Sequence, residues 1–151
     1  MDFLRKNEIE GLILDVDNTL IDLKKQMSQE IFNWTQKMKK EGIKLIILSN
    51  TNKKEKVRQI AEKLQVDYFF FARKPSKSGF KKAARKLNLK NENIASIGDQ
   101  IFTDVWGANR SKIYSILVKP LEEKDILITK IKRPLERLVI NRYLNEQKKG
   151  R

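Results

Sequence analysis

The 151 residues include no histidine and no cysteine. These absences exclude a cysteine nucleophile, a Ser/His/Asp triad, a histidine general acid and the usual zinc sites built from Cys and His. They also exclude disulfides, so the fold must be held together by its hydrophobic core. Any catalysis by this chain must therefore use carboxylates, lysines, hydroxyls and backbone amides.

Long hydrophobic runs are absent as well. No stretch approaches the ~18 apolar residues that would cross a bilayer. The N-terminal sequence MDFLRKNEIE is charged and lacks an apolar stretch of signal-peptide length. We therefore expect no transmembrane segment. The protein is expected in the cytoplasm, either free or peripheral on the inner face of the membrane.

Acidic residues are few relative to basic ones. There are 33 Lys plus Arg against 19 Asp plus Glu, which gives a formal net charge of +14. Such an excess favours anionic partners: nucleic acid, acidic lipid or phosphorylated small molecules. An excess of lysine is also common in soluble proteins that bind none of these, so charge alone does not choose between them.

Short apolar runs alternate along the chain with amphipathic patterns of helical period. Strands are expected at 11–16, 43–48, 67–71, 94–97 and 113–118. Helices are expected between them, the first with Ser28 as its N-cap. Their apolar stripes contain Ile31, Trp34 and Met38, then Val57, Ile60, Ala61 and Leu64, then Phe80, Ala83, Ala84 and Leu87. This order predicts one α/β domain with three layers, α/β/α, around a mainly parallel sheet. The apolar run Phe69-Phe70-Phe71 is expected to be buried in that sheet.

Polar residues stand at or shortly after the ends of the first four predicted strands. They are Asp15 and Asp17, then Ser49 and Asn50, then Lys74, and then Asp99. In parallel sheets ligands bind beyond the carboxyl ends of the strands, so these groups should meet at one edge. Asp15 and Asp17 are spaced to point the same way, so one could attack phosphorus while the other moves a proton. Two crowded acids also favour a hard cation such as Mg²⁺.

Four segments in this order resemble the motifs of the haloacid dehalogenase (HAD) superfamily of phosphotransferases. They are Asp15-Val16-Asp17-Asn18-Thr19-Leu20, Leu48-Ser49-Asn50, Lys74-Pro75 and Gly98-Asp99-Gln100-Ile101-Phe102-Thr103-Asp104. With Ala72-Arg73 before Lys74 and Gly107-Ala108-Asn109-Arg110 after Asp104, the chain is similar to the YqeG-type subgroup of class IIIA phosphatases. The resemblance implies a Rossmann-like HAD fold and a phosphomonoester hydrolase.

The resemblance also implies roles for two of the aspartates and a metal site. Asp15 would be the nucleophile that forms an aspartyl-phosphate. Asp17 would protonate the leaving group and then activate water. Asp15, the backbone carbonyl of Asp17, and Asp99 would bind Mg²⁺.

The remaining motif residues would handle the phosphoryl group. Ser49 and Asn50 would bind it, and Lys74 would offset its charge, with Lys77 as a rival for that role. Backbone amides of Asn18 and Thr19 would form part of its cradle. Asp104 would orient Lys74 or a metal-bound water.

No cap domain fits between the motifs, so the site should be open to solvent, as in family members that act on large or surface-bound substrates. The resemblance implies phosphatidylglycerophosphate hydrolysis in phospholipid synthesis. A phosphatase of nucleic-acid ends or nucleotides, and a non-catalytic nucleic-acid or ribonucleoprotein-binding module, remain alternatives.

We expect residues 1–120 to form the phosphatase core and residues 121–151 a basic helical extension. In 130–144 apolar and basic residues interleave. Such a helix could lie on an anionic membrane or pack on the sheet, and the sequence leaves both open, as it does the oligomeric state.

Overall fold

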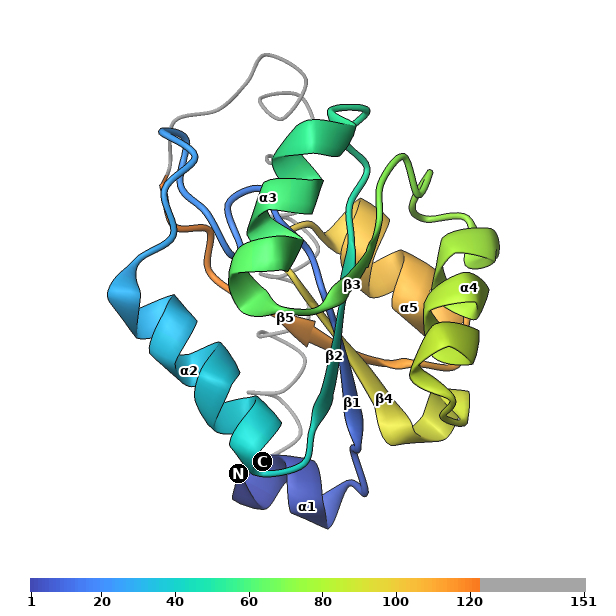
Figure 1. The fold of residues 1–151 in the computed structure, drawn as a ribbon. Coiled ribbons are helices and arrows are strands. Elements are labelled where there is room, and N and C mark those ends of the chain that lie inside the picture. Colours follow the sequence, from blue (N-terminus) through green and yellow to red (C-terminus); the bar gives the residue numbers. More distant parts are fainter. Residues whose placement is uncertain (123–151) are drawn as a thin grey trace, which may run out of the picture.

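Five parallel strands form a single sheet within residues 1–122, the part of the chain that this computed structural model describes (Figure 1). Their order across the sheet is β3-β2-β1-β4-β5. The strands are β1 (Gly11–Leu14), β2 (Lys44–Leu48), β3 (Asp67–Phe69), β4 (Ile94–Gly98) and β5 (Tyr114–Leu117). The chain thus builds outward from β1 to β3 and then crosses to the other side of β1, which leaves β1 between β2 and β4.

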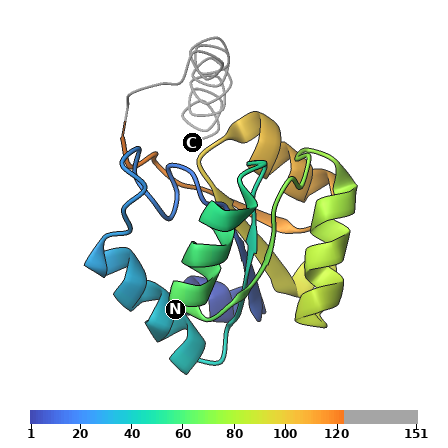
Figure 2. The same ribbon diagram turned by 45° about the horizontal axis from the view of Figure 1, so that its top comes forward.

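Helices cover both faces of this sheet (Figure 2). One face packs against α1 (Asp2–Lys6), α2 (Gln29–Lys40) and α3 (Lys54–Leu64), and the other against α4 (Lys77–Leu87) and α5 (Trp106–Arg110). Successive side chains of a strand point to opposite faces, and β1 shows this directly. Leu12 and Leu14 belong to the first core, whereas Ile13 belongs to the second. The predicted three-layer α/β/α fold is confirmed.

The predicted apolar stripes are the buried faces of their helices. Val57, Ile60, Ala61 and Leu64 are buried on α3, and Phe80, Ala83, Ala84 and Leu87 are buried on α4. The predicted N-cap is also confirmed, because the Ser28 hydroxyl accepts a hydrogen bond of 3.2 Å from the Ile31 N–H at the start of α2. Only α2 lies between β1 and β2, and only α3 lies between β2 and β3, so no cap domain interrupts the motifs.

The third strand is shorter than predicted. It ends at Phe69, and Phe70 and Phe71 are exposed, so the expectation of a buried run through residue 71 is wrong. The backbone leaves the extended conformation at Phe71, whose φ is 49°. There the Phe71 N–H donates to the Thr51 carbonyl and the Ala72 N–H to the Ser49 carbonyl, both at 2.9 Å. These bonds turn the chain toward the end of β2, which periodicity alone does not reveal.

The structure describes all of the core predicted for residues 1–120. Of the basic extension predicted for residues 121–151, the part after residue 122 lies outside the described residues. In residues 1–122 no helix combines the length and the apolar character needed to cross a membrane.

Candidate functional site

The carboxyl ends of β1 and β4 lie side by side at the point where the strand order reverses. Asp15 directly follows β1, and its N–H donates to the Ile97 carbonyl of β4 at 2.9 Å. Asp99 directly follows β4. In open α/β sheets this reversal leaves a crevice outside the strand ends, where ligands bind. The two aspartates stand at that crevice.

Lys74 lies between two buried carboxylates. Its Nζ is 2.6 Å from Asp15 Oδ1 and 2.5 Å from Asp104 Oδ1. Asp99 completes the group, since one oxygen each of Asp15, Asp99 and Asp104 lies within 4.8 Å of the others. The sheet therefore gathers three acids and one ammonium group from distant segments. We call these four residues the aspartate–lysine cluster.

Asn50 fixes the main chain of Lys74. Its Nδ2 donates to the Lys74 carbonyl at 3.0 Å, and its Oδ1 accepts from the Lys74 N–H at 2.6 Å. The side chain predicted to bind substrate is thus engaged with the chain that carries the lysine. Ser49, its neighbour at the end of β2, is buried, and its hydroxyl accepts from the Thr51 N–H at 3.3 Å. That hydroxyl still has a proton to donate.

Lys77 does not join the cluster. It is exposed and begins α4, whereas Lys74 is buried against Asp15. The geometry therefore places Lys74 where the phosphate-binding lysine was expected.

Asp104 reaches the cluster from η2 (Ile101–Val105), a π-helical segment that follows β4. Its Oδ2 accepts a hydrogen bond of 3.2 Å from the Gln100 N–H. A Cβ atom at Gly98 would overlap the Asp104 carboxyl group, so this position requires glycine. π-Helical segments often occur at functional sites, and here the segment directs an acid toward Lys74.

Asp17 follows Asp15 by two residues, and 50% of its side chain is exposed. It forms an ion pair with Lys56, which reaches it from the first turns of α3. Sequence reasoning missed Lys56, because nothing in the sequence distinguishes it from the neighbouring lysines at positions 53 and 54. The ion pair ties the candidate general acid to the helix that follows β2.

The loop after β1 uses its own amides. The Asn18 N–H donates to the Ile21 carbonyl at 2.9 Å, and the Thr19 N–H donates to the Val16 carbonyl at 3.3 Å. The phosphate cradle expected from these two amides is therefore not formed in this conformation. Within residues 1–122, Asn18 Oδ1 and Thr19 Oγ1 are buried without a hydrogen-bond partner.

Burial sets the protonation of the cluster. Loss of water raises the pKa of the Asp15 carboxyl from 3.8 to about 7; Lys74 opposes this rise, while Asp104 and Asp99 add to it. Burial would lower the pKa of Lys74, but Asp15 and Asp104 more than reverse that effect, so its pKa is raised. Lys74 is accordingly a cation at neutral pH. Asp15, whose pKa is about 7, changes its charge near neutral pH.

The cluster suits a hard divalent cation. Mg²⁺ prefers carboxylate oxygens and water in an octahedral shell, and three buried carboxylates supply the oxygens here. The clustered side chains are Asp15, Asp99 and Asp104, whereas the sequence assigned Asp104 to orienting Lys74 or a water. The donor set thus fits the predicted metal.

Comparison with known proteins agrees with this fold. Residues 33–112 match the haloacid dehalogenase-like hydrolases. Over 139 residues the chain is 37% identical to "Probable phosphatase YqeG" of Bacillus subtilis (strain 168), which covers 91% of this chain and 80% of that protein. The chain therefore belongs to the haloacid dehalogenase-like hydrolases, and the family resemblance seen in its motifs is confirmed.

Solved structures show the same fold at low identity. An uncharacterized protein from Listeria monocytogenes serotype 4b has a TM-score of 0.63 at 18% identity, with 78% of this chain and 85% of that chain covered. The 3-deoxy-D-manno-octulosonate 8-phosphate phosphatase from Moraxella catarrhalis, solved with magnesium ion, phosphate ion and KDO, has a TM-score of 0.52 at 18% identity. That match covers 67% of this chain and 64% of the other.

Proposed function

We propose that the chain is a Mg²⁺-dependent phosphomonoester hydrolase that works through an aspartyl-phosphate on Asp15. The observation that carries this proposal is the contact of 2.6 Å between Lys74 Nζ and Asp15 Oδ1 inside a group of three acids. A phosphoryl group bound at Asp15 would also contact the buried ammonium of Lys74. That ammonium would stabilise the negative charge of the phosphoryl group.

In the first step, Asp15 attacks phosphorus while the bond to the alkoxide breaks, and Asp17 gives its proton to that leaving oxygen. In the second step, Asp17 takes a proton from water, the water oxygen attacks phosphorus, and the bond to Asp15 breaks. Lys74 and the Ser49 hydroxyl hold the phosphoryl oxygens during both steps.

The metal and the exposure of Asp17 complete this assignment. When bound, Mg²⁺ would be held by Asp15 and Asp99, with the Asp17 carbonyl or Asp104 as a further ligand, and would supply positive charge to the phosphoryl oxygens. Asp17 is half-exposed, whereas Asp15 is buried. A general acid needs access to both the leaving group and water, and the more exposed of the two aspartates meets this need.

The substrate that we propose is phosphatidylglycerophosphate, whose hydrolysis yields phosphatidylglycerol, at the inner face of the membrane. The absence of a cap between β1 and β3 supports it, because an open site admits an ester displayed on a surface. The net charge of +14 favours an anionic surface. The similarity of the motifs to the YqeG-type subgroup supports the same substrate.

The test is a comparison of three esters with and without Mg²⁺: a soluble aryl phosphate, phosphatidylglycerophosphate in vesicles, and an oligonucleotide with a terminal phosphate. We expect Mg²⁺-dependent release of phosphate, fastest from the lipid, and none from Asp15→Asn. A preference for the oligonucleotide would replace the lipid by nucleic-acid ends as the substrate. No turnover of any ester would favour the non-catalytic binding module instead.

A further inference from the structure

Loops at the site's edge of the sheet expose large apolar side chains. Leu23 follows β1 and is 38% exposed, Phe70 and Phe71 follow β3 and are 38% and 51% exposed, and Leu121 follows β5 and is 45% exposed. The carboxyl ends of parallel strands share one edge, so these loops begin at the edge that holds Asp15. Exposed apolar side chains gathered around a polar site indicate a surface that meets another apolar phase.

Two of these loops are tied to the active-site segments by hydrogen bonds. The Leu121 N–H donates to the Asn18 carbonyl at 3.1 Å. The Phe71 N–H donates to the Thr51 carbonyl, close to Asn50. The apolar side chains are therefore fixed relative to the aspartate–lysine cluster.

The two phenylalanines each have a cation beside them, and the two leucines have lysines near them in the sequence. Lys54 Nζ lies 6.0 Å from the centroid of the Phe70 ring, and the Arg73 guanidinium lies 4.8 Å from that of Phe71. Lys24 and Lys25 directly follow Leu23, and Lys119 lies two residues before Leu121; all three lysines are exposed. Glu55, the acid next to Lys54, forms an ion pair with Arg58 at 2.6 Å.

The backbone holds the Phe71 side chain in its exposed place at some cost. Phe71 and Arg73 have φ values of 49° and 54°, in the left-handed region that is strained for residues other than glycine. Hydrogen bonds from the Phe71, Ala72 and Lys74 amides to residues 49–51, directly after β2, maintain this conformation. The turn that places Lys74 in the site therefore also presents Phe71 to solvent.

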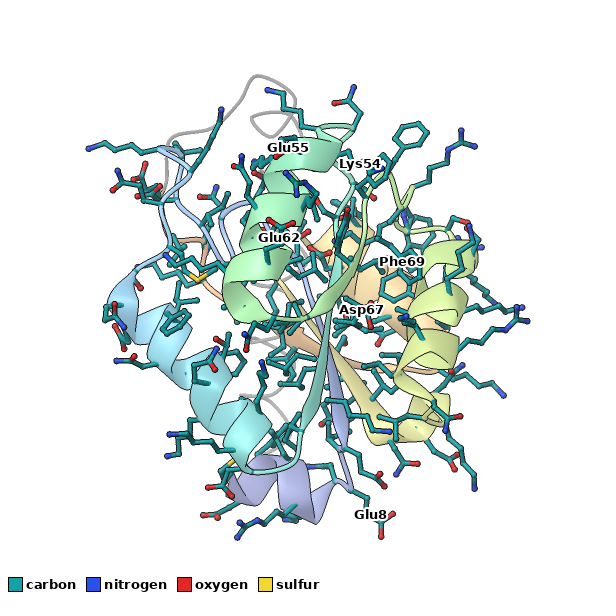
Figure 3. All side chains as sticks on the ribbon, viewed as in Figure 1. Glu8, Lys54, Glu55, Glu62, Asp67 and Phe69 are labelled. Atoms are coloured by element: carbon teal, nitrogen blue, oxygen red, sulfur yellow. The ribbon has the colours of Figure 1, made fainter. Side chains whose placement is uncertain are left out.

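The four apolar side chains belong to loops at the site's end of the molecule, although Phe3 and Tyr114 are exposed at the other end. Figure 3 shows Lys54 at one end of the molecule and Glu8, which precedes β1, at the opposite end. The site and the exposed Leu and Phe side chains of these loops share the end that holds Lys54.

We propose that Leu23, Phe70, Phe71 and Leu121, together with Lys24, Lys25, Lys54, Arg73 and Lys119, form an interfacial rim that docks the open site onto an anionic lipid bilayer. This inference rests on the proposed function, since it gives the phosphatase access to an ester displayed on a membrane. Apolar side chains would enter the boundary between headgroups and acyl chains, while the cations meet the anionic headgroups.

The rim fits a bilayer better than a nucleic acid. Single-stranded nucleic acids are held by stacking of bases on open aromatic faces. Here Arg73 lies over the Phe71 ring, and two of the four apolar groups are leucines, which cannot stack. A membrane interface accepts leucine and phenylalanine alike.

The experiment uses the full chain and vesicles of phosphatidylcholine alone or mixed with phosphatidylglycerol. The test variant is F70S/F71S, and the matched control is Phe3→Ser. Phe3 is 46% exposed but lies against Tyr114 at the amino end of β5, the opposite edge of the sheet. Vesicle binding is measured by sedimentation, and turnover of a soluble aryl phosphate reports whether the site is intact.

We expect the parent to bind the anionic vesicles, and F70S/F71S to bind them about tenfold or more weakly, because two phenylalanines no longer enter the interface. Soluble turnover by F70S/F71S and vesicle binding by Phe3→Ser should stay at the parent's values. A second variant, K24Q/K25Q, should weaken binding severalfold to anionic vesicles only.

Equal vesicle binding by the parent and F70S/F71S would refute the proposed membrane docking. So would a loss of vesicle binding in Phe3→Ser as large as that in F70S/F71S. Loss of oligonucleotide binding in F70S/F71S with vesicle binding kept overturns it in favour of nucleic acid. The substrate is judged separately, from the parent's preference among esters, so a rim that binds vesicles without lipid turnover would refute the proposed substrate alone.

Discussion

Asn50 holds Lys74 by both of its main-chain polar groups, accepting from its N–H at 2.6 Å and donating to its carbonyl at 3.0 Å. The lysine belongs to a loop after β3, and the asparagine follows β2, so the pair joins the ends of neighbouring strands. The position of the buried ammonium therefore depends on an amide that never touches it.

Replacing Asn50 by alanine should lower kcat strongly while the fold survives. Two hydrogen bonds are lost, which at about 1 kcal/mol each reduces the free energy of unfolding by roughly 2 kcal/mol. Turnover of a soluble phosphomonoester and a thermal melt measure the two effects. Asn52→Ala, an exposed position two residues on, should leave both unchanged. Equal activity of Asn50→Ala and the parent would show that Lys74 is placed by other contacts.

Lys74→Met should lower both stability and turnover more than Lys77→Met does. Removal of Lys74 leaves Asp15 and Asp104 buried without their shared cation, and breaking such a pair costs roughly 3–5 kcal/mol where no proton compensates. The loss should be smaller at acid pH, where Asp15 is protonated. Lys77 is exposed, so its replacement should change stability by less than about 0.5 kcal/mol. Urea unfolding of both variants, with turnover assays, decides which lysine serves the site.

The sequence predicted that Asp15 and Asp99 meet because parallel strands end at a common edge, whereas Asp104 was named only from the family resemblance. Alternation of apolar strands and amphipathic helices placed Asp15, Asp99 and Lys74 at that edge, and the structure brings them together. The two hydrogen bonds from Asn50 to the main chain of Lys74 could not be predicted from the sequence. They depend on how the loop after β2 lies against the loop after β3.

Phe70 and Lys56 illustrate two further limits. The apolar run at residues 69–71 has the composition of a buried strand, but hydrogen bonds to the end of β2 stop the strand at Phe69. The Lys56 contact with Asp17 depends on the rotation of α3 above the sheet, and one lysine among several in 53–56 carries no mark of it. Tertiary geometry, which local patterns do not encode, decides both.

Lys56→Met should reduce turnover with little loss of stability. The ion pair with Asp17 is partly exposed, and such pairs contribute about 1 kcal/mol or less. Its value lies in holding the Asp17 carboxylate near the mouth of the site, so kcat should fall more than KM changes. Lys53→Met, on an exposed neighbour, is the comparison. If the two variants have the same kcat, the Lys56 contact has no part in catalysis.

Mg²⁺ affinity should depend on pH through Asp15. Burial raises the pKa of this carboxyl to about 7 in the metal-free protein, whereas its usual value is 3.8. The folded state then binds a proton that the unfolded state has lost, so the metal-free protein loses stability as pH rises from about 4 to about 7. Mg²⁺ requires the carboxylate, so its binding near pH 6 should release a proton and tighten toward about pH 8.

Isothermal titration in buffers of different ionisation enthalpy measures that proton. Asp15→Asn has no carboxyl to ionise, and its residual Mg²⁺ binding should release no proton from this position. A pH-independent affinity in the parent would mean that Lys74 keeps Asp15 ionised throughout.

Gly98→Ala should imitate the loss of Asp104. The added Cβ would overlap the Asp104 carboxyl group, and the end of β4 is buried, so the acid and η2 must move rather than the strand. Asp104 should then lose its ion pair with Lys74, which is 2.5 Å long in the parent. Lys74 should keep only its ion pair with Asp15. We expect turnover to fall about as far as in Asp104→Asn, by about tenfold or more. The double variant should then be no worse than either single one, because both changes remove the same contact. Additive losses in kcat, measured on proteins with parent-like circular dichroism, would show that Gly98 serves the site by some other route than making room for Asp104.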